Sequence, residues 1–506
     1  MKRVCSFLTF FFVLTNVSSL YAQQLLIKSI SPLSGPAGSV VTLTGSGFNS
    51  TPAQNIVFFG AVKAEVTTAS ATQLSVIAPA GAGDQLVSVV NLGTKLSVYS
   101  ANPFVLTYPG TKTNVGVADF RSLTNLAVGF GTEAVAVSDL NSDNFPDILF
   151  INKLINKLTI LVNNGSKTSS VAEVFVSKIE LETGESPADI KVADLDADGK
   201  PDIIVSNSED NTISVFKNKS APGPLSSTSF ESPVKFATGS SPQKMSICDF
   251  DQDGRVDIMV GNKVGKSLSI LKNTSVDNPS FAQHTEIKTA NAPISVQTGD
   301  VDGDGLSDLL IVNDGTDKAT VYRNKCTPGN IKSDSFAGPV DFPGTKDTKS
   351  AIVADIDGDG KADLLVVGEY WHTLSIFRNV SNPGTVDQTS FTAPVDFLTD
   401  YSPNLVTVSD MNGDGLQDVI VSGKPPHSSV IFINNSVAGT IAKSSLGSSI
   451  HLGVQGASNF ISGNIDGDYR ADWVFNNTSD NTISVVQINT IVPAPAIESF
   501  SPASGT

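Results

Sequence analysis

Acidic segments nine residues long recur along the chain, and Asp194–Asp202 shows their pattern in full. Carboxylates stand at positions 1, 3, 5 and 9, and Gly199 stands at position 6. Alternating apolar residues precede the segment and an apolar run follows it, so we expect a loop between two strands. Four carboxylates gathered in one loop repel each other unless a hard cation with oxygen ligands lies between them. The spacing therefore predicts a divalent cation site.

Seven such loops begin at Asp139, Asp194, Asp249, Asp300, Asp355, Asp410 and Asn464, at spacings of 55, 55, 51, 55, 55 and 54 residues. In each loop, positions 1, 3, 5 and 9 carry the predicted ligands. Loop by loop these are Asp139, Asn141, Asp143 and Asp147; Asp194, Asp196, Asp198 and Asp202; Asp249, Asp251, Asp253 and Asp257; Asp300, Asp302, Asp304 and Asp308; Asp355, Asp357, Asp359 and Asp363; Asp410, Asn412, Asp414 and Asp418; Asn464, Asp466, Asp468 and Asp472.

An EF-hand also begins with this acidic pattern, but it needs Glu at position 12 and flanking helices. Here position 12 is apolar, as at Val205 and Ile311, and the flanking segments read as strands. The loops differ at position 6, where Asn144 suits a left-handed bend but Tyr469 is too bulky for one. We therefore expect up to seven bound calcium ions, with the seventh site weak or empty.

The loop spacing also predicts the fold that positions these residues. A period near 50 residues built from short strands is typical of solenoids and β-propellers. Each period reads as four short strands, and seven periods indicate a seven-bladed β-propeller. The chain enters this region with a lone outer-strand segment near 120–127 and leaves after Thr482–Gln487, one strand short of a full unit. We expect the first segment to complete the last blade and close the ring.

Residues 25–108 read instead as short alternating strands with turn signals about every ten residues, which favours a small β-sandwich. The stretch resembles the IPT/TIG family of immunoglobulin-like domains in Ser31-Pro32, Gly35–Gly38, Thr44–Phe48, Phe59-Gly60 and Ala78–Gly81. The resemblance implies a spacer or adhesion module with no catalytic residues. A short linker, 109–114, follows. The expected fold class is thus all-β, an immunoglobulin-like β-sandwich followed by a seven-bladed β-propeller.

The acidic loops resemble the FG-GAP calcium loops of integrin α-subunits and the related VCBS repeats of bacterial secreted proteins. The resemblance covers about residues 115–490. It implies a seven-bladed propeller in which each loop joins the two inner strands of a blade. Integrin propellers typically carry fewer metal loops than seven, which suggests that metal here chiefly stabilises the ring.

Charge and composition limit the partners. The formal net charge is -17, and the loops hold half of the 50 acidic residues. No basic stripe occurs, which argues against nucleic acid and anionic membrane as partners. The apolar core of the N-terminal segment is too short to span a bilayer, and no other apolar run is long enough for a transmembrane helix. Cys248 is expected to be a buried thiol, and a bridge to Cys326 is not favoured by the predicted strands.

The two ends of the chain predict export and a missing continuation. Residues 1–22 read as a secretory signal, with Lys2 and Arg3 before a short apolar core. Residues 497–506 repeat the opening of the first unit, so we expect the chain to stop inside a second IPT/TIG domain. Missing C-terminal domains would then offer attachment to the cell surface.

The sequence favours binding over catalysis. No nucleophile elbow, zinc-binding histidine pair or cysteine–histidine pair is evident. A turn at 369–372 holds Tyr370, Trp371 and His372, which either bind a sugar or peptide or pack between blades. We expect a secreted or cell-surface, non-enzymatic calcium-binding protein that binds an extracellular glycan or protein ligand. A calcium-dependent polysaccharide lyase and a purely structural spacer are the alternatives.

Overall fold

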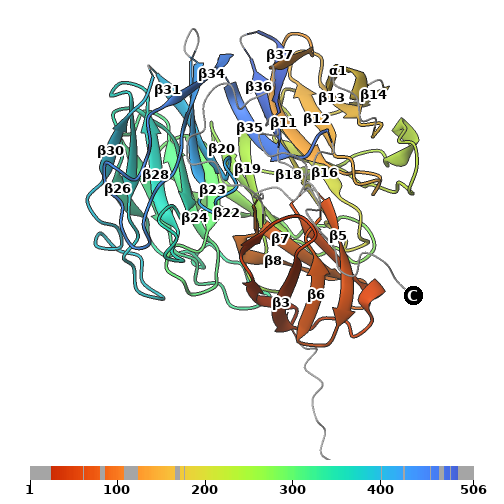
Figure 1. Cartoon of the computed structure of the whole chain (residues 1–506). Helices are drawn as coiled ribbons and strands as arrows, with labels where there is room; N and C mark the ends of the chain where they lie inside the picture. The colour runs from red at the N-terminus through yellow and green to blue at the C-terminus, as the bar shows by residue number, and fades with distance from the viewer. Residues whose placement is uncertain are drawn as a thin grey trace, which may run out of the picture.

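The computed structural model describes residues 24–60, 62–79, 86–107, 123–165, 171–175, 177–400, 402–424, 428–455, 457–466, 472–478 and 480–487. The predicted signal segment, the repeat at 497–506, and the loop residues Asp468 and Tyr469 lie outside this part of the chain. The described residues are almost all in β-strands, and the predicted fold class is confirmed (Figure 1).

The N-terminal unit is a β-sandwich whose strands run in the order β1-β3-β6-β5-β4-β7-β8. Strand β5 pairs with both β6 and β4, and so connects the two layers. Alternating apolar residues of both layers form one core, in which the rings of Phe59 and Phe104 meet edge to face at 5.2 Å. The strands are β1 (Leu26–Ser31), β2 (Ser34–Gly35), β3 (Val40–Ser46), β4 (Asn55–Phe59), β5 (Val62–Ala69), β6 (Gln73–Ile77), β7 (Leu86–Asn91), β8 (Leu96–Pro103) and β9 (Val105–Leu106).

The remaining strands form seven four-stranded antiparallel sheets, which are the blades of a propeller. In the first six blades the strands run from the inner to the outer edge in chain order. The blades are β11 (Thr132–Ser138), β12 (Asp147–Asn152), β13 (Lys157–Val162), β14 (Ser177–Glu182); β15 (Pro187–Ala193), β16 (Asp202–Asn207), β17 (Thr212–Phe216), β18 (Val234–Ala237); β19 (Pro242–Cys248), β20 (Asp257–Asn262), β21 (Ser267–Leu271), β22 (Thr285–Lys288); β23 (Pro293–Gly299), β24 (Asp308–Asn313), β25 (Lys318–Tyr322), β26 (Val340–Pro343); β27 (Thr348–Ala354), β28 (Asp363–Gly368), β29 (Thr373–Phe377), β30 (Val395–Leu398); β31 (Pro403–Ser409), β32 (Asp418–Gly423), β33 (Ser428–Phe432), β34 (Ile450–Gln455).

The seventh blade closes the ring as the sequence predicts. It consists of β35 (Ala457–Gly463), β36 (Asp472–Asn477) and β37 (Thr482–Val486), and its outer strand is β10 (Thr124–Ala127) from the start of the array. Strand β10 pairs antiparallel with β37, opposing Thr124 to Val485. One blade therefore contains both ends of the propeller, and the ring cannot open without breaking a sheet. A four-residue helix, α1 (Val171–Val174), and the short helices Pro52–Gln54 and Ser227–Ser229 are the helical elements of the described residues.

The second strand of every blade is wholly buried, as in β16 and β24. These strands are the apolar runs that follow the acidic loops in sequence. Each is covered on both faces by neighbouring blades, so a continuous apolar run suits it better than strict alternation. Hydrophobic clusters extend across blade boundaries, and one joins the first two blades through Leu149, Ile190 and Ile203.

The sandwich lies against one face of the ring, the face that carries the acidic loops (Figure 1). Ile56, Phe58 and Val90 of the sandwich form a buried cluster with Ala197 of the second loop. The backbone N–H of Ser97 donates to the carbonyl of Gly254 in the third loop at 2.5 Å. The N-terminal unit is therefore in direct contact with the loops.

Candidate metal centres

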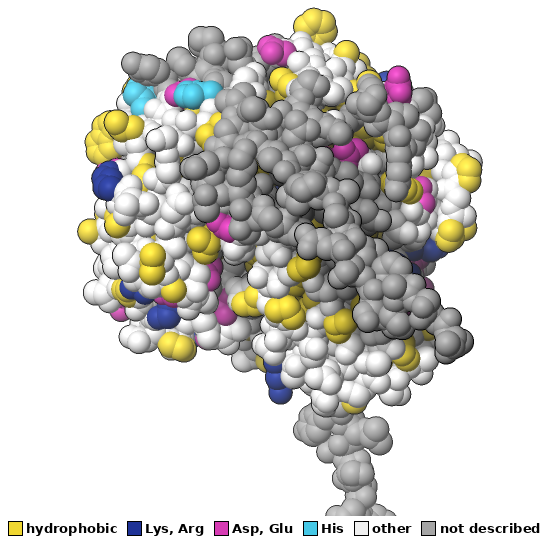
Figure 2. All heavy atoms as spheres, viewed as in Figure 1, with side chains coloured by type: hydrophobic (Ala, Val, Ile, Leu, Met, Phe, Trp, Pro, Cys, Tyr) yellow, Lys and Arg dark blue, Asp and Glu magenta, His cyan; other side chains and the backbone are white. Residues whose placement is uncertain are grey.

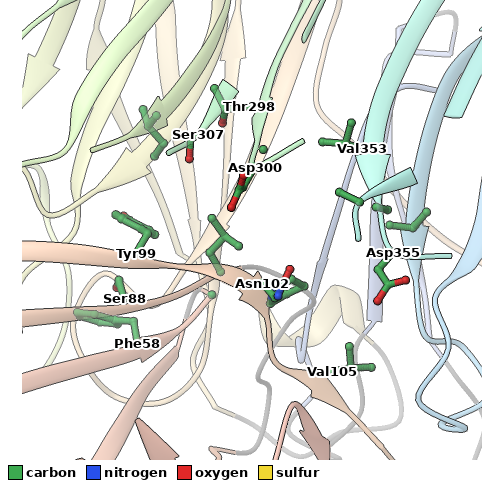
Figure 3. A pocket seen from close by; sticks show the side chains of 18 of the residues that line it. Phe58, Ser88, Tyr99, Asn102, Val105, Thr298, Asp300, Ser307, Val353 and Asp355 are labelled. Carbon is green, nitrogen blue, oxygen red and sulfur yellow. The ribbon is translucent and has the colours of Figure 1, made fainter. Parts of the chain in front are cut away.

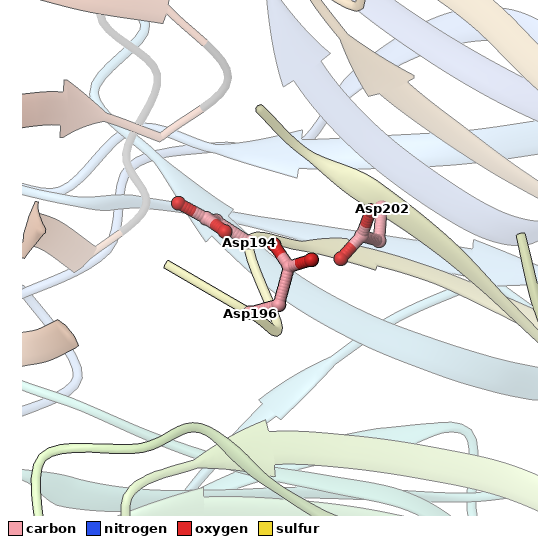
Figure 4. Close-up of side chains that lie close together, drawn as sticks. All are labelled: Asp194, Asp196 and Asp202. Carbon is pink, nitrogen blue, oxygen red and sulfur yellow. The ribbon is translucent and has the colours of Figure 1, made fainter. Parts of the chain in front are cut away.

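Each acidic loop connects the inner strand of a blade to its buried second strand. In the second blade, Asp194 directly follows β15 and Asp202 begins β16. Asp194, Asp196 and Asp202 are buried, and each offers a carboxylate oxygen to a common space in which these oxygens lie within 4.8 Å of one another (Figure 4). The sequence pattern therefore brings separated carboxylates to one point.

The same convergence occurs in four of the described loops. The trio comes from positions 1, 3 and 9 in loops 2 and 3, and from positions 1, 3 and 5 in loops 4 and 5. The trios are Asp194, Asp196 and Asp202; Asp249, Asp251 and Asp257; Asp300, Asp302 and Asp304; and Asp355, Asp357 and Asp359. The fourth predicted ligand of each of these loops is not part of the converging trio. These residues are Asp198, Asp253, Asp308 and Asp363. Loops 1 and 6 carry Asn141 and Asn412 at position 3.

The position 1 carboxylate organises the bend of the loop. Asp194 accepts the backbone N–H groups of Asp198 at 3.2 Å and Gly199 at 2.8 Å. Gly199 has φ +86°, and Asn144, its counterpart in loop 1, has φ +69° as expected. Position 4 is also left-handed, as at Ala197 with φ +55°, which the sequence pattern did not indicate.

The position 9 carboxylate is a predicted ligand that also accepts backbone hydrogen bonds from two other segments of its blade. Asp202 is fully buried, accepting the backbone N–H of Leu195 at 3.1 Å and that of Asn218 at 2.8 Å. The first six loops repeat both bonds. Removing this carboxylate would therefore damage the blade even if no cation binds.

A buried asparagine after the third strand connects each loop to the preceding blade. Asn218 donates from Nδ2 to the carbonyl of Leu140 in the first loop at 2.9 Å and to that of Pro201 in its own loop at 3.0 Å. Asn163 makes the corresponding bond between the first and last blades, donating from Nδ2 to the carbonyl of Ile465 at 2.9 Å. We call these residues the clamp asparagines. They are Asn163, Asn218, Asn273, Asn324, Asn379 and Asn434, and in the described residues they bridge six of the seven blade junctions.

Basic side chains already neutralise part of the loop charge, which corrects the expectation that only a bound cation relieves the repulsion. Arg378 Nε donates to Asp357 Oδ2 at 2.8 Å, and its Nη2 donates to Asp359 Oδ2 at 2.6 Å. Four blades have such a partner, each located immediately before a clamp asparagine: Lys217, Lys272, Arg323 and Arg378. The sequence signal was the Lys-Asn or Arg-Asn pair that ends the strand.

Burial makes the anionic loops costly despite these partners. It raises the pKa of Asp194 to about 7, and the neighbouring Asp198 carboxylate adds to the shift. Burial raises the pKa of Asp249 to about 7 and that of Asp308 to about 8. In the first loop it raises the pKa of Asp139 to about 6. Each of these carboxylates would ionise more readily if a cation bound nearby.

The donor set fits a hard cation. All predicted ligands are carboxylate or amide oxygens, which suit calcium or magnesium rather than soft metals. Asp196 is 2% exposed, and its Oδ1 receives no hydrogen bond from any described residue. In the first loop, the buried Asn141 Oδ1 likewise receives no hydrogen bond from any described residue. A buried oxygen without a donor is expensive unless something else satisfies it, and a cation would do so.

A cavity of about 580 Å³ lies between the sandwich and the loop face (Figure 3). Phe58 and Tyr99 line it from the sandwich, and Asp300 and Asp355 line it from the propeller. Burial, with the charge of Asp194, raises the pKa of Tyr99. No Lys, Arg or His is among the described residues that line the cavity.

The aromatic turn predicted from the sequence lies at the other end of the blades. It connects β28 to β29, whereas the acidic loop connects β27 to β28, so the two occupy opposite ends of β28. Tyr370 and Trp371 are 66% and 62% exposed, which rules out packing between blades for both rings. His372 is instead partly buried, with its Nδ1 accepting the backbone N–H of Ser402 at 3.1 Å.

The remaining surface adds few candidates. Among the described side chains visible in Figure 2, lysines and arginines are scattered and form no continuous patch. Cys248 and Cys326 are both buried free thiols. Within the described part of the chain, no helix has the length and apolar character needed to cross a membrane.

Two family models match the sequence. The IPT/TIG domain model matches residues 25–108. The FG-GAP-like repeat model matches five overlapping stretches, 139–205, 194–260, 249–311, 300–366 and 355–421, which together span more than half of the chain. A search of curated proteins returned no match.

Several solved structures are similar to this chain at low identity. An auxiliary nutrient binding protein from Bacteroides thetaiotaomicron is 12% identical, covering 92% of this chain and 97% of its own, with a TM-score of 0.37. A corresponding protein from Bacteroides ovatus is 13% identical, with the same coverage and a TM-score of 0.38. An Agrocybe aegerita lectin that recognises non-reducing terminal N-acetylglucosamine is 16% identical, covering 74% of this chain and 89% of its own, with a TM-score of 0.43. At these identities and TM-scores, none of these structures is used to assign a property to this chain.

Proposed function

This chain belongs to the FG-GAP-like repeat family, and we propose that it is a secreted or cell-surface protein that binds calcium in its blade loops and an extracellular ligand on the opposite face of the ring. The ligand is a glycan or a protein, and the protein has no catalytic activity of its own. Bound calcium supplies positive charge to the loops and stabilises the ring.

The loop carboxylates are the proposed calcium ligands. The four converging trios, with the orphaned Asp196 Oδ1, are the observations that support the assignment. Extracellular calcium modules bind at roughly 10⁻⁴ to 10⁻³ M, so millimolar calcium would add about 0.4–1.4 kcal/mol of stability per site. Summed over several loops, this is comparable with the whole stability of a domain.

The exposed pair Tyr370 and Trp371 is the observation that carries the ligand proposal. Two large aromatic side chains at more than 60% exposure offer a surface for stacking on a sugar ring or anchoring a peptide. Their turn is firmly held, because Lys424 bonds both carboxylate oxygens of Glu369 at 2.7 Å and the backbone N–H of Tyr370 donates to Lys346. These bonds hold the backbone of the turn that carries the pair, which limits the entropy cost of ordering that backbone on binding.

The position of the sandwich supports the same assignment. It lies against the loop face through the Ile56, Phe58 and Val90 cluster, which leaves the turn face of the ring free of this domain. A ligand too large for the cavity between the domains would bind on the turn face. Polymeric glycans and proteins are ligands of that kind.

A binding screen followed by substitution tests the ligand site. The full chain is applied to an array of immobilised glycans and then compared with the double variant Tyr370→Ala/Trp371→Ala. We expect the double variant to lose at least about tenfold in affinity for each glycan bound. Val264→Ala is the matched control, because Val264 is 70% exposed in the corresponding turn of the third blade.

Fluorescence gives an independent readout of the same site. The chain has two tryptophans, the exposed Trp371 and the fully buried Trp473. A quencher in solution should therefore affect mainly Trp371, and a bound glycan should protect it. Equal binding by the wild type and the double variant, or no protection of Trp371, would contradict the proposed site.

A further inference from the structure

In the first six blades, position 3 of the acidic loop and the residue before the clamp asparagine change together. The seventh blade has no clamp asparagine and combines Asp466 with the neutral Gln487, which donates to it. Blades 2 to 5 combine Asp at position 3 with a basic residue: Asp196 with Lys217, Asp251 with Lys272, Asp302 with Arg323, and Asp357 with Arg378. Blades 1 and 6 combine Asn with an aliphatic residue: Asn141 with Val162, and Asn412 with Ile433. The two positions are 21 residues apart in sequence, as the Arg378–Asp357 contact shows.

Both combinations supply a donor to the position 5 carboxylate. In the charged combination, Arg378 Nη2 donates to Asp359 Oδ2 at 2.6 Å, and Lys272 Nζ donates to Asp253 Oδ2 at 2.6 Å. In the neutral combination, the loop asparagine makes this contact itself. Asn412 Nδ2 donates to Asp414 Oδ2 at 2.9 Å, as Asn141 does to Asp143. Blade 2 differs, since Lys217 contacts Asp196 but not the position 5 carboxylate.

The formal charge is the same for both combinations. A loop of the first kind has four carboxylates and one cationic partner, and a loop of the second kind has three carboxylates and none, so both carry -3. This count covers the carboxylates and the partner before the clamp asparagine, and two of the basic residues at position 7 do not contact the carboxylates. Lys361 and Arg255 donate instead to the backbone oxygens of Ser381 and Ser275.

We propose that, in the first six blades, position 3 and the residue before the clamp asparagine form a matched pair, which sets the summed charge of the loop carboxylates and their cationic partner at -3. In all of these blades except the second, the pair also holds the position 5 carboxylate. Asp357 is fully buried, so losing Arg378 alone leaves a buried carboxylate without its cationic partner. Losing Asp357 alone leaves Arg378 with excess positive charge beside the cation site. The influence on cation binding rests on the calcium binding proposed above, whereas the contacts that hold the loop do not.

A double-mutant cycle in the fifth blade tests the pair. The full chain is compared with Asp357→Asn, Arg378→Ile and the double variant Asp357→Asn/Arg378→Ile, which reproduces the combination of blade 6. Melting temperatures are measured in chelator and at saturating calcium. We expect Arg378→Ile to lower the melting temperature in chelator by about 5 °C or more. The double variant should recover at least half of that loss.

Calcium should affect the two single variants in opposite ways. The rise in melting temperature from chelator to calcium should be larger than in the wild type for Arg378→Ile, whose loop carries -4. It should be smaller for Asp357→Asn, whose loop carries -2, and close to the wild-type value for the double variant. Lys361→Ile is the control, because it removes a positive charge from the same loop without a contact to the carboxylates.

The two solution conditions separate the pair from the calcium proposal. Coupling in chelator, with no effect of calcium on any variant, would support the contacts of the matched pair and contradict calcium binding. Additive losses in both conditions, with calcium stabilising all four proteins equally, would overturn the matched pair and leave calcium binding supported. Arg378→Ile behaving like Lys361→Ile would also overturn the pair.

Discussion

At the scale of single residues, the clamp asparagines connect the acidic loops to the ring. The backbone N–H of Asn273 donates to Asp257, while its Nδ2 donates to Leu195 of the preceding blade and Val256 of its own, both at 2.9 Å. Asn273 is 1% exposed, so removing its side chain leaves two buried carbonyls without their donor. Through its backbone and side-chain N–H groups, this one residue connects the end of its strand to its own loop and to the preceding blade.

Replacing Asn273 by Ala should therefore lower the free energy of unfolding by about 1–3 kcal/mol, the range for buried carbonyls left without donors. Chemical denaturation of the full chain measures this change. Asn278→Ala, at an exposed residue of the following turn, should change it by less than about 0.5 kcal/mol. Equal effects of the two substitutions would refute a structural role for the clamp.

At the scale of elements, each loop joins its blade's inner strand to its second strand. The loops also hold buried carboxylates whose ionised form is unfavourable. Asp194 and Asp249 have pKa values raised to about 7 by burial, above the ordinary value of about 3.9. Because the folded state binds protons that the unfolded state has released, these groups favour folding at low pH. Their contribution is fully present below about pH 4 and is lost as pH rises through about 7.

In chelator, the free energy of unfolding should therefore fall between pH 5 and pH 8. Between pH 5 and the folded pKa, the fall is about 1.4 kcal/mol per pH unit for each carboxyl whose pKa is raised, and it levels off above that pKa. Calcium binds the ionised carboxylates, so saturating calcium should reduce or reverse the fall. Denaturation curves at both pH values, with and without calcium, measure this. Stability in chelator that rises from pH 5 to pH 8 would show that burial does not dominate these groups.

At the scale of the whole molecule, the loops serve two interfaces. They join neighbouring blades through the clamp asparagines, and they support the sandwich through Ala197 and Gly254. Strand β10 completes the last blade, so the closed ring fixes the loops relative to one another. The sandwich and the cavity thus lie at the loop end of the blades, while the Tyr370 turn lies at the other end.

The sequence predicts repeated features well and single contacts poorly. Seven loops at a fixed period, each within four short strands, predicted the repeat array. The lone strand at its start and the missing strand at its end predicted closure through β10. The Arg-Asn pair marks Arg378 in the sequence, but the carboxylates that it contacts, Asp357 and Asp359, lie about 20 residues away and follow from the strand register. The contact of Phe58 with Ala197 depends on how two domains pack, which no local pattern encodes.

Calcium binding by the full chain tests the central proposal most directly. Equilibrium dialysis against millimolar free calcium, followed by metal analysis of the protein, measures the number of ions bound. We predict at least four ions per chain, one for each converging trio of carboxylates, with the number falling by one in Asp194→Asn/Asp196→Asn. Fewer than one ion per chain at millimolar free calcium would contradict the assignment of the blade loops as calcium sites.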